Sequence, residues 1–371
     1  MSCKSFAAET QQRNGHLPGS VFYAVSLCLL GVILFLAACG KEPLYQEQAY
    51  VFGTQVDVSI YGEDETKARQ AVATVMHEFQ RLHDLLHAWK PSELSALNAA
   101  FAREKSIEIS PELAAMLQDA ARMSVQSGGL FNPAIGGLIQ TWGFQADDFK
   151  AILPDEKKIT ALVQANPQMS DLVFLPSPAG ARGVLVSSRN PAVKIDLGGY
   201  AKGYALDRAA ALLKQQGIKN ALINIGGNVL ALGQHGSRAW RVGIQHPRKP
   251  GPLATLALQD GEAIGTSGDY QRYFELNGKR YCHLIDPRSG YPAQGTQAVT
   301  ILTHGERAGL LSDGSSKPLF ITGAQGWRAA AQQMQISEAM LIDTDGVVHI
   351  TAELKKRLEF TDKATIIKIE S

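Results

Sequence analysis

The sequence predicts an α+β fold. Helix-like and strand-like segments are mixed along the chain without regular alternation, which favours this class over a doubly wound sheet. A chain of 371 residues that is 45% hydrophobic and 19% charged can bury a full core, in one large domain or two smaller ones. The net charge is +1 and both signs are spread along the chain, so the electrostatic footprint of a nucleic-acid-binding protein is excluded. We therefore expect small-molecule or protein partners.

The N-terminal segment predicts export. Lys4 and Arg13 precede an apolar run from Val21 to Ala38, which ends in Leu36-Ala37-Ala38-Cys39. The run is at the lower limit of about 18 residues for spanning a bilayer, whereas the core of a signal peptide is usually about 7–15 residues. A single transmembrane anchor is therefore the alternative. Small residues before a cysteine fit a signal-peptidase cleft and resemble a bacterial lipobox, with Cys39 as the lipidated residue.

The expected organisation follows from this leader. Residues 1–38 are predicted to be a signal peptide, residues 39–48 a lipidated polar tether, and residues 49–371 the folded domain. The domain would then be extracytoplasmic, on the periplasmic face, and anchored to a membrane. Gly40 resembles the outer-membrane sorting pattern. Cys3, Cys28 and Cys39 fall in or beside the leader, so Cys282 has no obvious disulfide partner.

The first structured segments are a strand and two helices. Residues 55–60 alternate polar and apolar side chains, as a half-buried strand does. Residues 66–86 carry apolar side chains at helical spacing and predict a long amphipathic helix. Ser110 and Pro111 form an N-cap followed by a first-turn proline, so a second helix is expected from there to Gly128 and Gly129.

Later elements are shorter. Residues 200–216, rich in alanine and leucine and closed by Gly217, predict a helix that leads into a buried strand at residues 221–225. Asp345 and Gly346 between apolar runs predict a hairpin turn. Further short strands are expected at residues 240–244, 261–266, 273–276 and 299–302.

The most informative segment is the loop Asp196–Gly203, which directly precedes the helix at residues 200–216. Its glycines, Gly198, Gly199 and Gly203, allow a ligand to approach the backbone, and Lys202 adds a positive charge. Together with free amides at the helix N-terminus, these features can hold a phosphate or diphosphate. The alternative is a tight strand-to-helix turn with a surface lysine. The loop matches neither a Walker motif nor a dinucleotide fingerprint.

Several segments occur in the order that resembles the ApbE family, from Gly53-Thr54 to about Gly323. They are Phe131–Gly136 with Trp142–Phe144, Asp196–Gly203 with Asn224–Asn228, Thr266–Tyr270, and His283–Pro292. The resemblance implies a single α+β domain of a T-fold-related type. It also implies an enzyme that binds FAD and, with Mg²⁺, transfers FMN to a threonine of a target flavoprotein and releases AMP. The expected targets are membrane subunits of electron-transport complexes.

The resemblance assigns the loop to the diphosphate of FAD and residues 130–132 to its isoalloxazine and ribityl groups. Asn132 replaces a frequent aspartate, which keeps an acceptor and loses a charge. Trp89 stands where relatives often have a tyrosine against the flavin, and a core aromatic is the alternative. Phe52 replaces a frequent methionine. The residues implied to bind FAD are Phe52, Trp89, Leu130, Phe131, Asn132, Asp196, Lys202 and Ile285.

The implied Mg²⁺ site consists of the main-chain oxygen of Ala201, the carboxylate of Asp313 and residue 317. Relatives often have a threonine there, and this chain has Lys317. An ammonium group cannot ligate a cation, so only its main-chain oxygen, or the hydroxyl of Ser315 or Ser316, could substitute. The metal would be held by fewer side chains, Lys317 would point away, or Lys317 would replace one charge of the metal. Loss of catalysis is a fourth possibility.

His283 is the candidate general base, because imidazole accepts a proton near neutral pH. A structural histidine is the alternative. The Asp286–Gly290 segment would form the turn that positions it, and Asp269 and Arg288 are expected to be structural. Two other activities fit the same residues: an FAD pyrophosphatase that releases FMN and AMP, and a non-catalytic flavin-binding lipoprotein, which only Lys317 favours.

Overall fold

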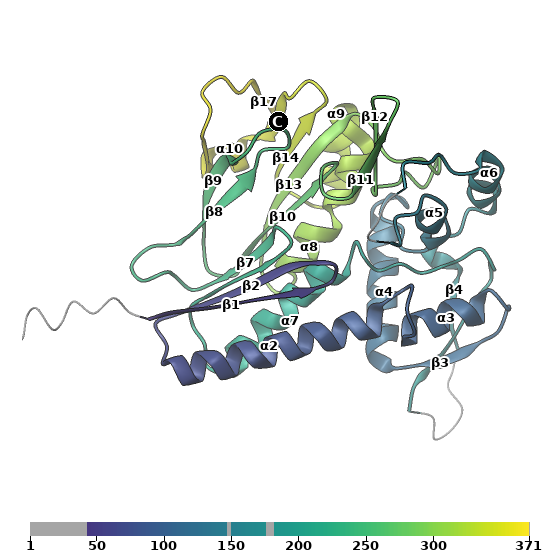
Figure 1. Ribbon diagram of the computed structural model, residues 1–371, viewed down its shortest axis with the longest axis horizontal. Helices are drawn as coiled ribbons and strands as arrows, with labels where there is room; N and C mark the ends of the chain where they lie inside the picture. Colours follow the sequence, from purple (N-terminus) through teal and green to yellow (C-terminus); the bar gives the residue numbers. More distant parts are fainter. Residues whose placement is uncertain (1–42, 147–149, 176–181, 371) are drawn as a thin grey trace, which may run out of the picture. The chain divides into compact units, whose positions relative to one another are not determined.

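The computed structural model describes residues 43–146, 150–175 and 182–370 (Figure 1). The expected signal peptide, Cys39 and Gly40 lie outside these residues. Within the described ranges, no helix combines the length and apolarity that a bilayer crossing requires. The described residues form one compact unit, in agreement with a single domain.

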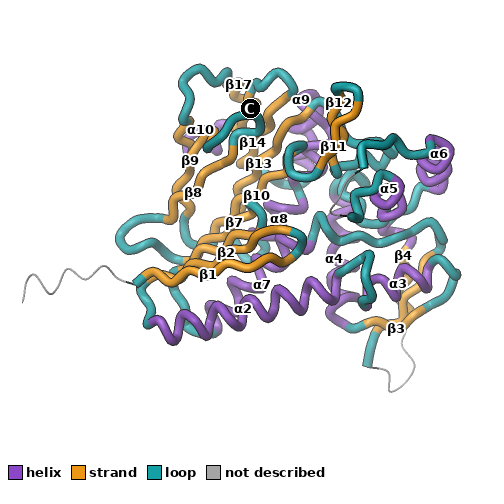
Figure 2. Tube along the Cα trace, in the orientation of Figure 1, coloured by secondary structure: helices purple, strands orange, loops and turns teal. Residues whose placement is uncertain are grey.

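The centre of the fold is a large sheet whose neighbouring strands are antiparallel except for one parallel pair at the C-terminal end. Figure 2 shows these strands running side by side across the molecule. In spatial order they are β1 (Leu44–Val51), β2 (Thr54–Tyr61), β6 (Ala221–Ile225), β7 (Asn228–Leu232), β10 (Glu262–Gly268), β13 (Thr296–His304), β14 (Glu338–Asp343), β15 (Val348–Thr351) and β17 (Ile367–Glu370). The predicted hairpin at Asp345 and Gly346 is confirmed, because β14 and β15 pair antiparallel across it.

Helices cover one face of this sheet. They are α2 (Glu65–Leu86), α7 (Ala201–Gln215), α8 (Ala308–Gly314) and α9 (Ser316–Gln333). The side chain of Asp64 caps α2 by accepting hydrogen bonds from the amides of Thr66 and Lys67. The apolar stripe of α2, which includes Phe79 and Leu82, is fully buried in one core with the inward side chains of β2 and β6. The predicted helices at residues 66–86 and 200–216 are thus confirmed within one residue at each end.

A small sheet covers the opposite face. It consists of β8 (Trp240–Gln245), β9 (Pro252–Leu258) and β16 (Leu358–Phe360), with α10 (Ala352–Arg357) leading into β16. Its apolar side chains form a second core with outward residues of the large sheet, such as Ile264 and Met340. The large sheet is therefore buried on both faces, which explains why β7 and β13 are almost continuously buried.

The remaining elements lie beside these layers. They are α3 (Glu93–Phe101), α4 (Pro111–Gln126), α5 (Gly136–Thr141), α6 (Glu156–Ala165), the 3-10 helix η1 (Met169–Asp171), a sheet of β3 (Ile107–Ile109), β5 (Val184–Ser188) and β4 (Leu172–Leu175), and the hairpin of β11 (Tyr273–Leu276) and β12 (Lys279–Cys282). Ser110 caps α4 and Pro111 begins it, as predicted. A third apolar cluster joins α5 and α6 to the β11–β12 hairpin.

One sequence-based expectation needs correction, and one helical segment was not predicted. The tether was expected to reach residue 48, but β1 begins at Leu44 and pairs along its whole length with β2. Its alternating exposed and half-buried side chains are those of an edge strand, whose weak apolar pattern reads as polar linker. For residues 308–333 the sequence predicted candidate metal ligands but no secondary structure, and the segment forms α8 and α9.

Candidate active site

The loop Asp196–Gly203 lies at the start of α7, where no side chain caps the helix. Asp196 Oδ1 accepts a hydrogen bond of 2.7 Å from the amide of Gly198, and Gly198 is exposed. Burial raises the pKa of Asp196, and hydrogen bonds from Gly198 and Trp89 oppose this shift. The loop therefore combines an exposed backbone turn with an uncapped helix N-terminus.

Two glycines bring α8 against this loop. A Cβ atom on Gly203 would lie 2.5 Å from the carbonyl oxygen of Gly309, and one on Gly309 would lie 2.6 Å from that of Gly203. Any larger residue at either position would separate the two helices. Asp207 of α7 fixes the same junction, because its carboxylate accepts hydrogen bonds of 2.7 and 2.9 Å from the amides of Gly309 and Leu310.

This junction places Asp313 beside the loop. Its side chain is 2% exposed, and Oδ2 accepts a hydrogen bond of 3.0 Å from the amide of Gly203. Lys202 Nζ lies 4.0 Å from Oδ1. Lys317, from the first turn of α9, donates to Oδ1 and also, at 2.7 Å, to the main-chain oxygen of Asp313. We call Lys202, Asp313 and Lys317 the loop cluster.

Positive charge is in excess in the loop cluster. Burial opposes ionisation of Asp313, but Lys202 and Lys317 hold the pKa of its carboxyl below the usual value. Burial lowers the pKa of Lys317 to about 8, and Asp313 opposes that shift. One carboxylate therefore faces two ammonium groups.

The residues of the loop cluster do not fit the Mg²⁺ site expected from the sequence. Mg²⁺ needs oxygen ligands in near-octahedral geometry, and the carboxylate of Asp313 already carries hydrogen bonds on both oxygens. Ser316 Oγ donates to the carbonyl of Asp313, and Ser315 Oγ is buried without a partner among the described residues. Across the described ranges, no group of three or more His, Cys, Asp or Glu side chains could hold a metal.

The expected set of metal ligands therefore needs correction at Lys317, whose side chain is not a ligand. The possibility that it points away is wrong, because its ammonium group contacts Asp313. Ala201 lies buried in the first turn of α7, and its role as a ligand remains a prediction.

His283 follows β12 and faces the same region. Its Nδ1 lies 3.2 Å from the carbonyl oxygen of Arg272. Because a carbonyl can only accept, Nδ1 carries the proton and Nε2 keeps a free lone pair. Burial lowers the pKa of His283 to about 3, and the positive charges of Lys202 and Arg272 contribute to the shift. The imidazole is thus neutral at physiological pH and has a lone pair to accept a proton, but a pKa of about 3 makes it a weak base in the protein without ligand. Its role as the general base stays a prediction.

The aromatic residues expected to contact the flavin differ in exposure. Trp89 is half-buried, and Lys194 Nζ lies 4.6 Å from its ring centroid. Its indole is also within hydrogen-bonding reach of Asp196, and it packs against the edge of the main apolar core, so it lies where the loop meets the core. Phe52 is at the β1–β2 turn with a φ of 57° and packs edge-on against Phe79 and His83.

Three of the other expected FAD-binding residues have structural contacts. The Asn132 side chain donates to the carbonyl of Pro167 and accepts from the amide of Ala134. Phe131 is 3% exposed and lies against Gly199 of the loop. Ile285 is buried in the third apolar cluster, so its side chain serves the core. Leu130, next to Phe131, is half-buried. Direct contact of these residues with FAD stays a prediction.

The comparison with known families agrees with this geometry. The sequence model described as the ApbE family matches residues 52–341. The chain belongs to the ApbE family. A relative from Rhodobacter capsulatus, named FAD:protein FMN transferase, is 41% identical over 336 residues, which cover 91% of this chain and 62% of that protein. One from Klebsiella pneumoniae with the same name is 31% identical over 86% of this chain and 94% of its own.

Solved structures of ApbE proteins share the fold. The ApbE protein of Thermotoga maritima superposes with a TM-score of 0.75 at 26% identity, over 85% of this chain and 99% of that one. The flavin transferase ApbE of Vibrio cholerae gives a TM-score of 0.71 at 22% identity, over 85% and 99%. The α+β class predicted for this ApbE-family chain is therefore confirmed.

Sequence reasoning did not single out Asp207, Arg272 or Lys194. Asp207 follows Lys202 by five positions in a helix, where an acidic side chain is usually exposed to solvent. Arg272 donates to the carbonyls of Phe144 and Ala146, from another part of the chain, which no local pattern shows.

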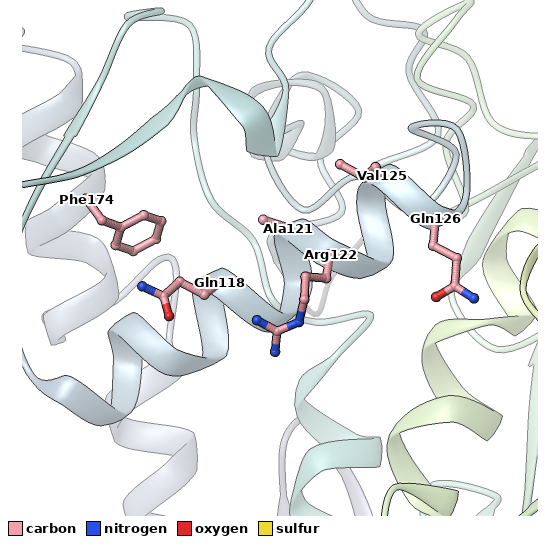
Figure 3. Close-up of a pocket in the computed structure, with 6 residues that line it drawn as sticks. All are labelled: Gln118, Ala121, Arg122, Val125, Gln126 and Phe174. Atoms are coloured by element: carbon pink, nitrogen blue, oxygen red, sulfur yellow. The ribbon is translucent and has the colours of Figure 1, made fainter.

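A hollow on the outer side of α4 is separate from the candidate site (Figure 3). It is lined by side chains of α4 and by Phe174 of β4, and it contains none of the predicted site residues.

Proposed function

We propose that this ApbE-family enzyme transfers FMN from FAD to a threonine of a target flavoprotein, at the loop Asp196–Gly203. The observation that carries the proposal is the surplus positive charge of the loop cluster at an uncapped helix N-terminus. A diphosphate supplies the matching negative charge, and backbone amides of an exposed loop provide its hydrogen-bond donors. The curated relatives are named for this reaction.

In the proposed reaction, the threonine Oγ attacks the FMN-side phosphorus of FAD. The bond from that phosphorus to the bridging oxygen breaks, and AMP leaves. Nε2 of His283 accepts the hydroxyl proton, which its neutral state and its tautomer permit. Lys202 and Lys317 offset negative charge that develops on the leaving phosphate. We assign no step to Mg²⁺, because the loop cluster does not fit it.

The flavin would bind on the Trp89 side of the loop. The exposed part of the indole offers a stacking surface, and Lys194 holds the ring from one side. Phe131 and Leu130 would border the ring near Gly199. This placement puts the diphosphate between the flavin and the adenosine, at the loop cluster.

The cellular setting is also a proposal. The leader that ends at Cys39 supports an exported, lipid-anchored enzyme on the periplasmic face of a membrane. An anchor of this kind would hold the enzyme close to membrane-bound electron-transport subunits that carry an acceptor threonine. Labelling of the full chain with radioactive palmitate, with Cys39→Ala as the control, tests the anchor.

The activity is tested by incubating the full chain in detergent with FAD and a threonine-motif acceptor. We expect covalent flavin on the acceptor and an equimolar amount of AMP, and at least about a hundredfold slower formation of both products with His283→Gln. FMN and AMP without labelled acceptor would establish the FAD pyrophosphatase instead. FAD binding without AMP would leave only the non-catalytic flavin-binding lipoprotein.

A further inference from the structure

We infer that the ammonium group of Lys317 is a built-in replacement for a divalent cation, so that FAD binding in this protein does not depend on Mg²⁺. The inference rests on the proposed function and deepens it. It follows from the disagreement between the loop cluster and the oxygen-rich site that a hard cation requires.

The side chain of Lys317 is directed into the site. It is 13% exposed, and its ammonium group is bonded to both the carboxylate and the main-chain oxygen of Asp313. Its Cε lies 3.4 Å from the position that a Cβ on Gly199 would occupy. The lysine therefore runs along the loop and ends on the carboxylate that otherwise offers the best oxygen ligands.

Charge balance also disfavours a bound divalent ion. With Lys202 Nζ 4.0 Å from Asp313 Oδ1, the cluster already carries one net positive charge. A Mg²⁺ ion beside it would meet two ammonium groups at short range in a partly buried site, where such repulsion is weakly screened. A diphosphate meets attraction from both lysines.

A lysine side chain has the chemistry needed to replace a cation beside a diphosphate. Its ammonium group is a compact point charge with three donors, and lysine is a common phosphate-binding residue. Asp313 orients the ammonium group and leaves hydrogen-bond capacity for a phosphate oxygen. The carboxylate then acts as a positioning group for Lys317.

The test compares FAD binding to the full chain in EDTA and in excess Mg²⁺, followed by flavin fluorescence. For the wild-type protein we expect the two dissociation constants to agree within about threefold. Lys317→Thr should bind FAD at least about tenfold more weakly in EDTA than in Mg²⁺, since one charge–phosphate contact is lost. Lys214→Thr, at an exposed position near the end of α7, is the matched control and should behave as wild type.

A second measurement reads the metal directly and needs no active variant. In electron paramagnetic resonance with Mn²⁺, we expect no tightly bound ion on the wild-type protein and one on Lys317→Thr. Wild-type binding of FAD that requires Mg²⁺, or a tightly held Mn²⁺ on the wild type, would overturn the inference and leave the proposed function intact. Absence of FAD binding under either condition would instead overturn the proposed function itself. Magnesium-independent binding by both wild type and Lys317→Thr would also overturn the role of the lysine.

Discussion

The loop cluster can be compared with a second group of polar side chains near the C-terminus. There, His349 of β15 is placed between two carboxylates, with Nδ1 2.6 Å from Glu370 Oε1 and Nε2 2.9 Å from Asp343 Oδ2. Trp327 Nε1 donates to the other oxygen of Glu370 at 3.0 Å. We call His349, Asp343 and Glu370 the C-terminal cluster. It joins β17 to β14 and β15 at the edge of the large sheet (Figure 1).

The two clusters differ in charge balance and in the use of their donors. In the C-terminal cluster, both imidazole nitrogens are paired with carboxylates of the same chain, and Val347 and Asp345 donate to Asp343 as well. The polar groups of this cluster therefore have their hydrogen-bond partners within the protein. In the loop cluster, two lysines share one carboxylate beside an exposed backbone turn. The comparison indicates that the C-terminal cluster stabilises the fold and that the loop cluster is arranged for an anionic ligand.

The largest expected effect concerns the base beside the loop cluster. His283→Ala should lower the rate of FMN transfer by about 10²–10⁴-fold, because proton transfer by a positioned side chain contributes that much. FAD affinity should change by less than about threefold. Single-turnover transfer and flavin fluorescence give the two quantities. An unchanged rate would mean that His283 has only a structural role.

The next largest effect is expected on the FAD affinity of the loop cluster, without an effect on the stability of the protein. Lys202→Met should weaken FAD binding by about tenfold to a hundredfold, corresponding to about 1.4–2.8 kcal/mol. Its free energy of unfolding should remain near that of wild type, because Lys317 still pairs with Asp313. Fluorescence titration and urea denaturation measure the two properties. Equal FAD affinity in Lys202→Met and wild type would contradict the assignment of the loop cluster to the ligand.

At the C-terminal cluster we expect a loss of stability without a change in FAD affinity. His349→Leu leaves two carboxylates without their shared partner, so the free energy of unfolding should fall by about 3 kcal/mol. FAD affinity should be unchanged. Urea denaturation followed by circular dichroism gives the stability. A change in FAD binding without loss of stability would reverse the assignment of the two clusters.

A smaller effect concerns the junction that positions Asp313. Burial raises the pKa of Asp207 to about 7, against about 3.9 in an unfolded chain. Between these values the folded protein holds a proton that the unfolded chain has released. The contribution of Asp207 to stability is therefore present below about pH 4 and is lost as the pH rises through about 7.

Asp207→Asn should remove this contribution. We expect the fall in unfolding free energy between pH 4 and pH 7 to be smaller by about 2 kcal/mol in the variant than in wild type. Urea denaturation at several pH values measures it, with Asp260→Asn as a control outside the α7–α8 junction. Parallel pH profiles for wild type and Asp207→Asn would show that Asp207 stays ionised in the folded protein.

The smallest expected effect lies at the flavin end of the site. Trp89→Ala should weaken FAD binding by about fivefold to tenfold, as aromatic pairs contribute about 0.5–1.5 kcal/mol. Trp89→Phe should restore most of the affinity. Equal affinities for all three proteins would place the flavin elsewhere.

The helices and turns that were predicted correctly depend on local sequence patterns. The periodicity of residues 66–86, the Ser110–Pro111 start and the Asp345–Gly346 turn each depend on neighbouring residues, and each is confirmed. Edge strand β1 was taken for tether because one exposed face dilutes its apolar pattern. Helices α8 and α9 were not predicted, because the serine, glycine and proline of residues 312–318 are typical of turns and interrupt a helical pattern.

The sequence predicted which residues belong to the candidate site but not how their side chains contact one another. The sequence suggested that Asp196, Lys202, His283 and Asp313 act together, and the fold brings Lys202 and Asp313 into contact. The direction of the Lys317 side chain follows from a contact with Asp313, four positions earlier, across the α8–α9 junction. It could not be predicted because these two helices were not predicted. The structural bonds of Asn132 depend on Pro167, far along the chain.

The central claim is that the positive charge of the loop cluster holds the diphosphate of FAD. It is tested most directly by measuring the affinities of the full chain for FAD and for riboflavin, which lacks phosphate, in the same EDTA buffer. We predict that FAD binds at least about a hundredfold more tightly, a difference of about 2.8 kcal/mol. Riboflavin affinity equal to that of FAD would contradict the account.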